Sequence, residues 1–219
     1  MNVRGLLFDF DGLLVDTESP SRRVWEELYR EHGHELPHDR WATVVGTIGA
    51  DFSPFGHLEE LVGAPLDRDS VNARRRKRED ELNALESFRA GVEEYLADAH
   101  RLGLMTAIVS SSWRWWVDRH LGRLDRTDSW DAIVTADGDI ERAKPSPTLY
   151  LEALRMLGLA SDEAIAFEDS PNGVAAAKSA GLFCVAVPNP ITAALAFDRA
   201  DLVLESLDEL PLDRLLERL

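Results

Sequence analysis

Six short apolar segments separated by helical patterns constrain the fold of this chain more than any other feature. They span residues 3–10, 105–111, 132–135, 164–169, 183–187 and 201–206. Several are apolar throughout, which is typical of strands in a parallel sheet that is covered on both faces. A glycine follows each of three helical patterns between them, at 91–102, 147–157 and 173–180, as expected at a helix C-terminus. The alternation predicts a doubly wound α/β fold with a parallel, Rossmann-like sheet.

Residues 16–86 interrupt this rhythm. They consist of charged helical patterns without a convincing buried strand. We interpret them as an all-helical insertion between the first strand and the rest of the sheet. The α/β core domain then comprises residues 1–15 and 87–219.

Composition limits the kinds of partner. A net charge of −16 over 219 residues argues against nucleic acid or an anionic membrane as the main partner. No apolar run approaches the length of a membrane span, and Asp9 comes too early for a signal peptide. The single cysteine, Cys184, lies in an apolar run and is expected to be a buried thiol. We therefore expect a cytoplasmic protein that is a monomer or, alternatively, a homodimer.

Two acidic residues, Asp9 and Asp11, stand at the end of the first apolar segment in FDFDGLLVDTE. On a strand, side chains two residues apart point to the same side, and two like charges at roughly 4 Å repel by about 4 kcal/mol at an effective dielectric of about 20. No basic residue in this stretch can pair with them. A positive group from elsewhere should therefore lie between them, at the edge where ligands of open parallel sheets gather.

Other predicted strand ends carry matching chemistry. Hydroxyl groups end the second segment, a lysine lies in a loop stiffened by prolines, and two acids end the fourth segment: Ser110, Ser111, Ser112, Lys144, Glu168 and Asp169. With the first pair they bring four carboxylates together with one ammonium. Mg²⁺ suits this balance because it takes few carboxylates together with waters and a substrate phosphate. One carboxylate could then attack phosphorus while its neighbour handles the proton.

Four motifs in this order, DFDGLLVDTE, VSSS, KPSPTLY and EDSPNG, resemble the signature motifs of the haloacid dehalogenase superfamily. The resemblance covers essentially the whole chain. The helical insertion, residues 16–86, is similar to the C1-type cap domain of the β-phosphoglucomutase-like branch. The resemblance implies a Mg²⁺-dependent enzyme with a Rossmann-like core and a cap.

The resemblance also implies roles for individual residues. Asp9 would be the nucleophile that forms an aspartyl-phosphate, and Asp11 the general acid and then the general base. Ser110, Ser111 and Lys144 would bind the phosphoryl group. Mg²⁺ would be held by Asp9, the backbone carbonyl of Asp11, Asp169 and, directly or nearby, Glu168.

The preferred interpretation is a phosphatase for a small phosphorylated metabolite, foremost a sugar phosphate. Asp11 favours a phosphatase over a dehalogenase, which needs no acid at that position. Phosphonatases of similar architecture use a lysine early in the cap as a Schiff base, whereas the first lysine of this insertion is Lys77, near its end. A β-phosphoglucomutase-like mutase is the alternative. It is weakened because Ser21 stands where mutases carry a histidine and the turn at 46–51, GTIGAD, lacks an arginine. A non-catalytic protein that binds phosphorylated ligands is the alternative of another class, and the intact motifs argue against it.

Two residues outside the motifs are candidates for substrate binding. Trp113 lies beside the serines, where an indole would suit a sugar face, although packing is its more ordinary role. Lys77 lies in the basic run 74–78, which by itself predicts a solvated helix face. Only three of the 24 basic residues are lysines, however, and related caps carry a lysine in their last helix. We expect Lys77 to reach the active site when the cap closes.

Replacing Lys77 tests this expectation. Lys77→Ala should lower kcat/KM on the best substrate about tenfold, or about 1.4 kcal/mol, because a flexible ammonium would be lost from the closed site. Arg75→Ala, two residues away, should matter little in the same steady-state assay. Equal and small changes in kcat/KM for the two variants would indicate that Lys77 is a solvated surface residue.

Overall fold

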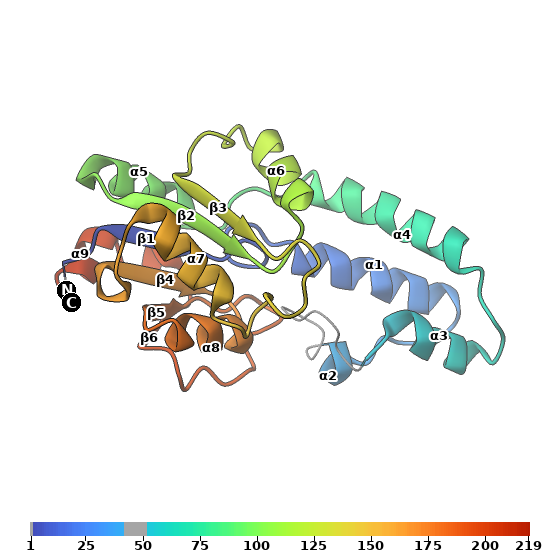
Figure 1. The fold of residues 1–219 in the computed structure, drawn as a ribbon. Helices are drawn as coiled ribbons and strands as arrows, with labels where there is room; N and C mark the ends of the chain where they lie inside the picture. The colour runs from blue at the N-terminus through green and yellow to red at the C-terminus, as the bar shows by residue number, and fades with distance from the viewer. Residues whose placement is uncertain (1, 42–51) are drawn as a thin grey trace.

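A six-stranded parallel sheet forms the centre of the computed structural model, which describes residues 2–41 and 52–219 except the side chain of Asp39. The strand order is β3-β2-β1-β4-β5-β6 (Figure 1). The strands are β1 (Gly5–Phe8), β2 (Met105–Ser110), β3 (Ala132–Thr135), β4 (Ala164–Glu168), β5 (Phe183–Ala186) and β6 (Leu202–Val203). The predicted fold class is confirmed.

Helices cover both faces of this sheet. One face packs on α5 (Val92–Leu102), α6 (Arg114–Arg123) and α9 (Leu212–Leu216), and the other on α7 (Thr148–Leu157) and α8 (Pro171–Ser179). Short 3₁₀ helices precede β4 and α9, at Ser161–Glu163 and Leu207–Glu209. Along β1, Leu6 and Phe8 enter the first apolar cluster and Leu7 the second. Because both faces are buried, the strands read as continuous apolar runs.

The helical insertion consists of α1 (Glu18–Glu31), α2 (His38–Trp41), α3 (Pro54–Val62) and α4 (Arg68–Asn83). Helices α1, α3 and α4 extend away from the sheet (Figure 1). They share an apolar cluster of their own, which includes Trp25, Tyr29, Leu58 and Leu82. Ile191, from the loop after β5, is also buried in this cluster. The insertion therefore has its own core, and a loop of the sheet side reaches into it.

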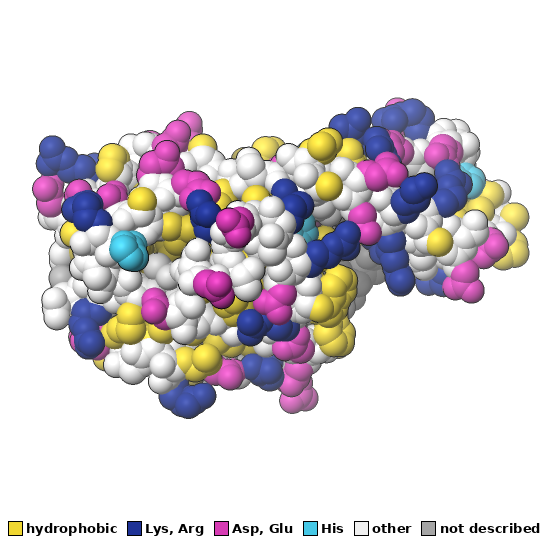
Figure 2. All heavy atoms as spheres, turned by 90° about the horizontal axis from the view of Figure 1, so that it is seen from above, with side chains coloured by type: hydrophobic (Ala, Val, Ile, Leu, Met, Phe, Trp, Pro, Cys, Tyr) yellow, Lys and Arg dark blue, Asp and Glu magenta, His cyan; other side chains and the backbone are white. Residues whose placement is uncertain are grey.

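The basic run on α4 is paired with acidic side chains. Arg74 lies 2.6 Å from Glu31, and Arg78 lies 3.1 Å from Glu27, both on α1. Positive and negative side chains are interspersed on the face shown in Figure 2, over the sheet and over the insertion alike. These contacts agree with a solvated helix face. Within the described residues, no helix combines the length and the apolarity that crossing a membrane would require.

Some local expectations need correction. Strand β1 ends at Phe8, so Asp9 and Asp11 lie in the turn beyond it and not on the strand. Gly103 and Gly158 are left-handed helix C-caps as expected, with φ of 69° and 66°. The short helices α2 and α9 were not expected. The turn at 46–51, on which part of the argument against a mutase depends, lies outside the described residues.

Candidate active site

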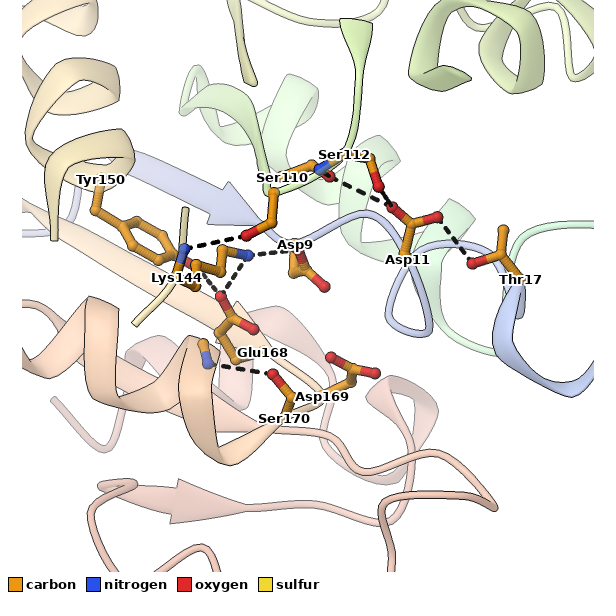
Figure 3. Close-up of polar contacts among 12 residues, drawn as sticks. Asp9, Asp11, Thr17, Ser110, Ser112, Lys144, Tyr150, Glu168, Asp169 and Ser170 are labelled. Atoms are coloured by element: carbon orange, nitrogen blue, oxygen red, sulfur yellow. Dashed lines mark hydrogen bonds and ion pairs between the residues drawn. The ribbon is translucent and has the colours of Figure 1, made fainter. Parts of the chain in front are cut away.

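The strand order brings the predicted site residues together. Strand β1 lies between β2 and β4, with Phe8 in register with Ile108 and Phe167. The carboxyl ends of these strands are therefore adjacent. Asp9, Ser110 and Glu168, which come from three separate segments of the chain, meet at this edge (Figure 3).

Lys144 is the positive group beside Asp9. Its Nζ contacts Asp9 Oδ1 and lies 2.7 Å from Glu168 Oε1. The three side chains are only 4%, 10% and 0% exposed, respectively. The loop after β3 delivers Lys144, whose backbone N–H donates to Ser111 Oγ at 3.1 Å. Tyr150, on the first turn of α7, donates its hydroxyl to Glu168.

Asp11 is held separately, by neutral donors. Its Oδ1 accepts hydrogen bonds from Thr17 Oγ1 at 2.8 Å and Trp116 Nε1 at 2.7 Å, and its Oδ2 accepts one from Ser112 Oγ at 2.6 Å. Ser110 Oγ lies farther from Oδ2, at 3.4 Å. The two carboxylates therefore have different partners, and the expectation that they share a cation stays a prediction. The turn after β1 directs Asp9 toward Lys144 and Asp11 toward the hydroxyl groups of Thr17 and Ser112 (Figure 3).

The site residues fit a hard divalent cation such as Mg²⁺. Carboxylate oxygens of Asp9, Glu168 and Asp169 lie within 4.8 Å of one another, and all three residues are buried. Glu168 Oε2 has no hydrogen-bond partner among the described residues, although it is fully buried. Asn189 Nδ2 orients Asp169 by donating to its Oδ2 at 2.7 Å. A clustered set of oxygen ligands with an unsatisfied lone pair is what Mg²⁺ would require here.

Burial and mutual repulsion alter the ionisation of this cluster. Burial raises the pKa of Asp9, and that of Glu168 to about 7, in each case against the lowering effect of Lys144. Burial, followed by the charges of Asp9 and Glu168, raises the pKa of Asp169 well above its usual range. Burial would lower the pKa of Lys144, but the two carboxylates that it contacts raise it overall. One ammonium is therefore too little charge for three buried acids, and a divalent cation would favour their ionised forms.

Two glycines leave room for the carboxylates of Asp169 and Glu168. Gly12 has a φ of +83°, and a Cβ there would overlap Asp169 Oδ2 and Asn189 Nδ2. A Cβ at Gly173, in the first turn of α8, would overlap the Glu168 carboxylate. The glycines of the first and fourth motifs are thus needed because these carboxylates occupy the space of a side chain.

A cavity of about 280 Å³ opens above these residues, between the sheet edge and the helical insertion. Its motif residues include Asp9, Asp11, Ser110, Ser111 and Lys144. Ser112, predicted together with the other two serines, lines it as well. The lining also includes residues without a predicted role: Thr17, Glu18, Ser21, Arg75, Glu79, Asn83, Trp116 and Ser170. Thr17 and Glu18 belong to the first motif and Ser170 to the fourth. No sequence signal pointed to Arg75, Glu79 and Asn83 on α4, because their direction depends on how the insertion lies on the sheet.

The two candidates outside the motifs do not line this cavity. Lys77 is exposed on α4 and borders a different groove, between α1 and α4. Trp113 is 52% exposed and packs on Gly138, whereas Trp116 faces the cavity. Arg75 lines the cavity and is therefore unsuitable as the neutral control for Lys77→Ala. The exposed Arg76 is a better one.

A parallel sheet that presents buried acids and a lysine beneath a helical insertion defines a Rossmann-like hydrolase. The sequence model of the haloacid dehalogenase-like hydrolases matches residues 6–187. The chain belongs to this family, and the resemblance seen in its four motifs is confirmed.

Individual relatives agree with this assignment. YhcW of Bacillus subtilis (strain 168), to which phosphatase activity is ascribed, is 45% identical over 99% of this chain and 98% of its own length. Hexitol phosphatase A of Escherichia coli (strain K12) is 30% identical, with 96% of this chain and 94% of the relative covered. A Thermotoga maritima structure described as a β-phosphoglucomutase is similar with a TM-score of 0.80 at 25% identity, over 99% of this chain and 100% of that one. The prediction of a phosphatase of this superfamily is confirmed.

The raised pKa values predict how Mg²⁺ stabilises the protein. In the unfolded chain these carboxyl groups have a pKa of about 4, whereas burial raises the pKa of Glu168 to about 7 in the folded protein. Without metal, the folded protein should therefore lose stability as the pH rises from about 4 to about 7. Because Mg²⁺ binds the ionised acids, it should raise Tm by several degrees more at about pH 8 than at about pH 5. Thermal unfolding in EDTA and in excess Mg²⁺ measures this difference.

Asp169→Asn is the matched variant, and it should lose most of the Mg²⁺-dependent shift at the higher pH. An equal Mg²⁺ shift at both pH values would contradict the ionisation behaviour described for this cluster.

Proposed function

We propose that this protein is a Mg²⁺-dependent phosphatase that hydrolyses a small phosphorylated metabolite, foremost a sugar phosphate, through an aspartyl-phosphate on Asp9. The observation that carries the proposal is the buried cluster in which Lys144 contacts both Asp9 and Glu168, with Asp169 alongside. The hexitol phosphatase among its relatives supports a sugar phosphate as substrate.

In the first half-reaction, a carboxylate oxygen of Asp9 attacks phosphorus, and the bond from phosphorus to the sugar oxygen breaks. Asp11, in its protonated form, gives a proton to the departing alkoxide. Thr17, Ser112 and Trp116 orient this carboxyl group through their hydrogen bonds. In the second half-reaction, Asp11 accepts a proton from water, which attacks phosphorus and releases phosphate from Asp9.

Lys144 and the serines act on the phosphoryl group. Lys144 keeps Asp9 in place and offers positive charge to phosphoryl oxygens as they develop negative charge. Ser110 and Ser111 line the same cavity and supply hydroxyl donors. Asp9, Glu168 and Asp169, with the backbone carbonyl of Asp11, would hold Mg²⁺. When bound, Mg²⁺ would neutralise these acids and polarise the phosphoryl group.

The setting of the enzyme follows from the same features. We place residues 16–86 as a cap over the cavity, because α1 and α4 contribute its outer lining. The net charge of −16 argues against nucleic acid or an anionic membrane as a partner, and the single, buried cysteine is consistent with a cytoplasmic enzyme. A mutase is the second candidate, favoured by the structural similarity to a β-phosphoglucomutase.

Removing the nucleophile tests the covalent step. Asp9→Asn should abolish turnover, since an amide does not form the acyl-phosphate, while the protein stays folded with one buried charge fewer. Phosphate release over many turnovers, with circular dichroism as the folding control, is the measurement. Sustained turnover by a pure Asp9→Asn preparation would exclude Asp9 as nucleophile.

Metal exchange tests the cofactor. EDTA should abolish phosphate release, and Mg²⁺ should restore it better than Ca²⁺, because calcium takes more ligands at longer distances and would displace the phosphoryl group from Asp9. Rates of metal-free enzyme with each ion decide this. Faster turnover with Ca²⁺ would contradict the proposed metal.

A further inference from the structure

The outer lining of the cavity contains a group that the proposed chemistry does not use. It consists of Ser21 on α1 and Arg75, Glu79 and Asn83 on α4, which we call the polar wall. Arg75 Nη1 lies 2.6 Å from both carboxylate oxygens of Glu79, and Ser21 Oγ donates to Glu79 Oε1 at 3.0 Å. The Arg75 guanidinium also lies over the ring of Trp25, 5.8 Å from its centroid. The wall is therefore built from paired groups in a fixed arrangement.

The charge of Arg75 is already compensated. Glu79 contacts it with both oxygens, and the two side chains are only 23% and 15% exposed. The other cation that lines the cavity, Lys144, is paired with Asp9 and Glu168. Segment 42–51, ATVVGTIGAD, contains no lysine, arginine or histidine. A second phosphate entering beside the polar wall would meet no uncompensated positive side chain of the cavity lining, and it would face the carboxylate of Glu79.

Two atoms of the polar wall still lack partners. Asn83 Oδ1 and Arg75 Nε are buried, and neither has a hydrogen-bond partner within the part of the chain that the structure describes. Asn83 is only 5% exposed. Buried polar atoms without partners are rare and cost free energy, and both residues belong to the lining of the cavity. Asn83 Oδ1 accepts a hydrogen bond and Arg75 Nε donates one, and a hydroxyl group can both donate and accept.

We propose that the polar wall binds the hydroxyl groups of an uncharged polyol and rejects a second phosphate, so that the substrates are sugar or polyol monophosphates. This inference rests on the proposed phosphatase site for the position of the reacting phosphate. It also separates the two candidate functions, because a mutase that transfers phosphate between two positions of one sugar must bind that sugar with a phosphate at each. The small cavity, about 280 Å³, suits a substrate of hexose phosphate size.

Matched pairs of sugar phosphates test the selectivity. The probes are glucose 6-phosphate and fructose 6-phosphate, each beside its bisphosphate (glucose 1,6-bisphosphate and fructose 1,6-bisphosphate), with the full chain and Mg²⁺. We expect the monophosphate of a pair to have at least a tenfold higher kcat/KM and to bind at least tenfold more tightly to Asp9→Asn in calorimetry. Equal or stronger binding of the bisphosphates, or binding of neither member of either pair, would overturn the inference.

Variants of the polar wall test its cause. Glu79→Gln leaves the charge of Arg75 uncompensated and should raise the ratio of bisphosphate to monophosphate kcat/KM about tenfold. Asn83→Ala should lower kcat/KM for the preferred monophosphate about tenfold relative to p-nitrophenyl phosphate, which has no sugar hydroxyls. Glu81→Gln is the matched control, because Glu81 is on the same helix but pairs with Arg78 outside the cavity. Ratios in the two wall variants that equal those of Glu81→Gln would overturn the inference.

Failure of the proposed function would look different. If the wild-type protein released no phosphate from p-nitrophenyl phosphate or from any sugar phosphate, the phosphatase assignment would fall. Calorimetry on Asp9→Asn would still decide between monophosphate and bisphosphate, because binding needs no turnover.

Discussion

A single buried ammonium shared among three buried carboxylates governs this structure. Lys144 contacts Asp9 and Glu168, with Asp169 alongside, and their charges do not balance. Burial and this imbalance raise the pKa values of Glu168 and Asp169, and one oxygen of Glu168 has no partner among the described residues. Such a cluster could hold a divalent cation. The sheet order serves the same requirement, because only adjacent strand ends bring charges from distant segments of the chain into one buried cluster.

The sheet and the motif residues were predictable because each depends on local sequence. Residues 105–110 and 183–186 are almost entirely buried and mostly apolar, so their strand character is visible without knowledge of their neighbours. The acids that follow β1 and β4 meet because parallel strands end at a common edge. The sequence did not show that the two acids of the first turn have different partners. Asp11 accepts hydrogen bonds from Thr17 and Trp116, whereas Asp9 contacts Lys144.

The lining contributed by the insertion was not predictable in the same way. Residues two apart on a helix point in very different directions, so Arg75 and Lys77 cannot both face the cavity. Which of them does depends on how α4 lies over the sheet, and composition, which favoured the rarer lysine, carries no information about that. The structure places Arg75 in the lining of both the cavity and the groove between α1 and α4, and Lys77 in the lining of that groove. The closed position of Lys77 stays a prediction.

The loop after β5 links Asp169 to the insertion. Asn189 donates to Asp169, Thr192 Oγ1 donates to the backbone carbonyl of Asp169, and Ile191 between them is buried in the apolar cluster of the insertion. A hinge motion of the insertion that kept Ile191 packed would pull on both hydrogen bonds. The position of the insertion and the orientation of the Asp169 carboxylate are therefore coupled through residues 189–192. A ligand that fixed this carboxylate would favour one position of the insertion.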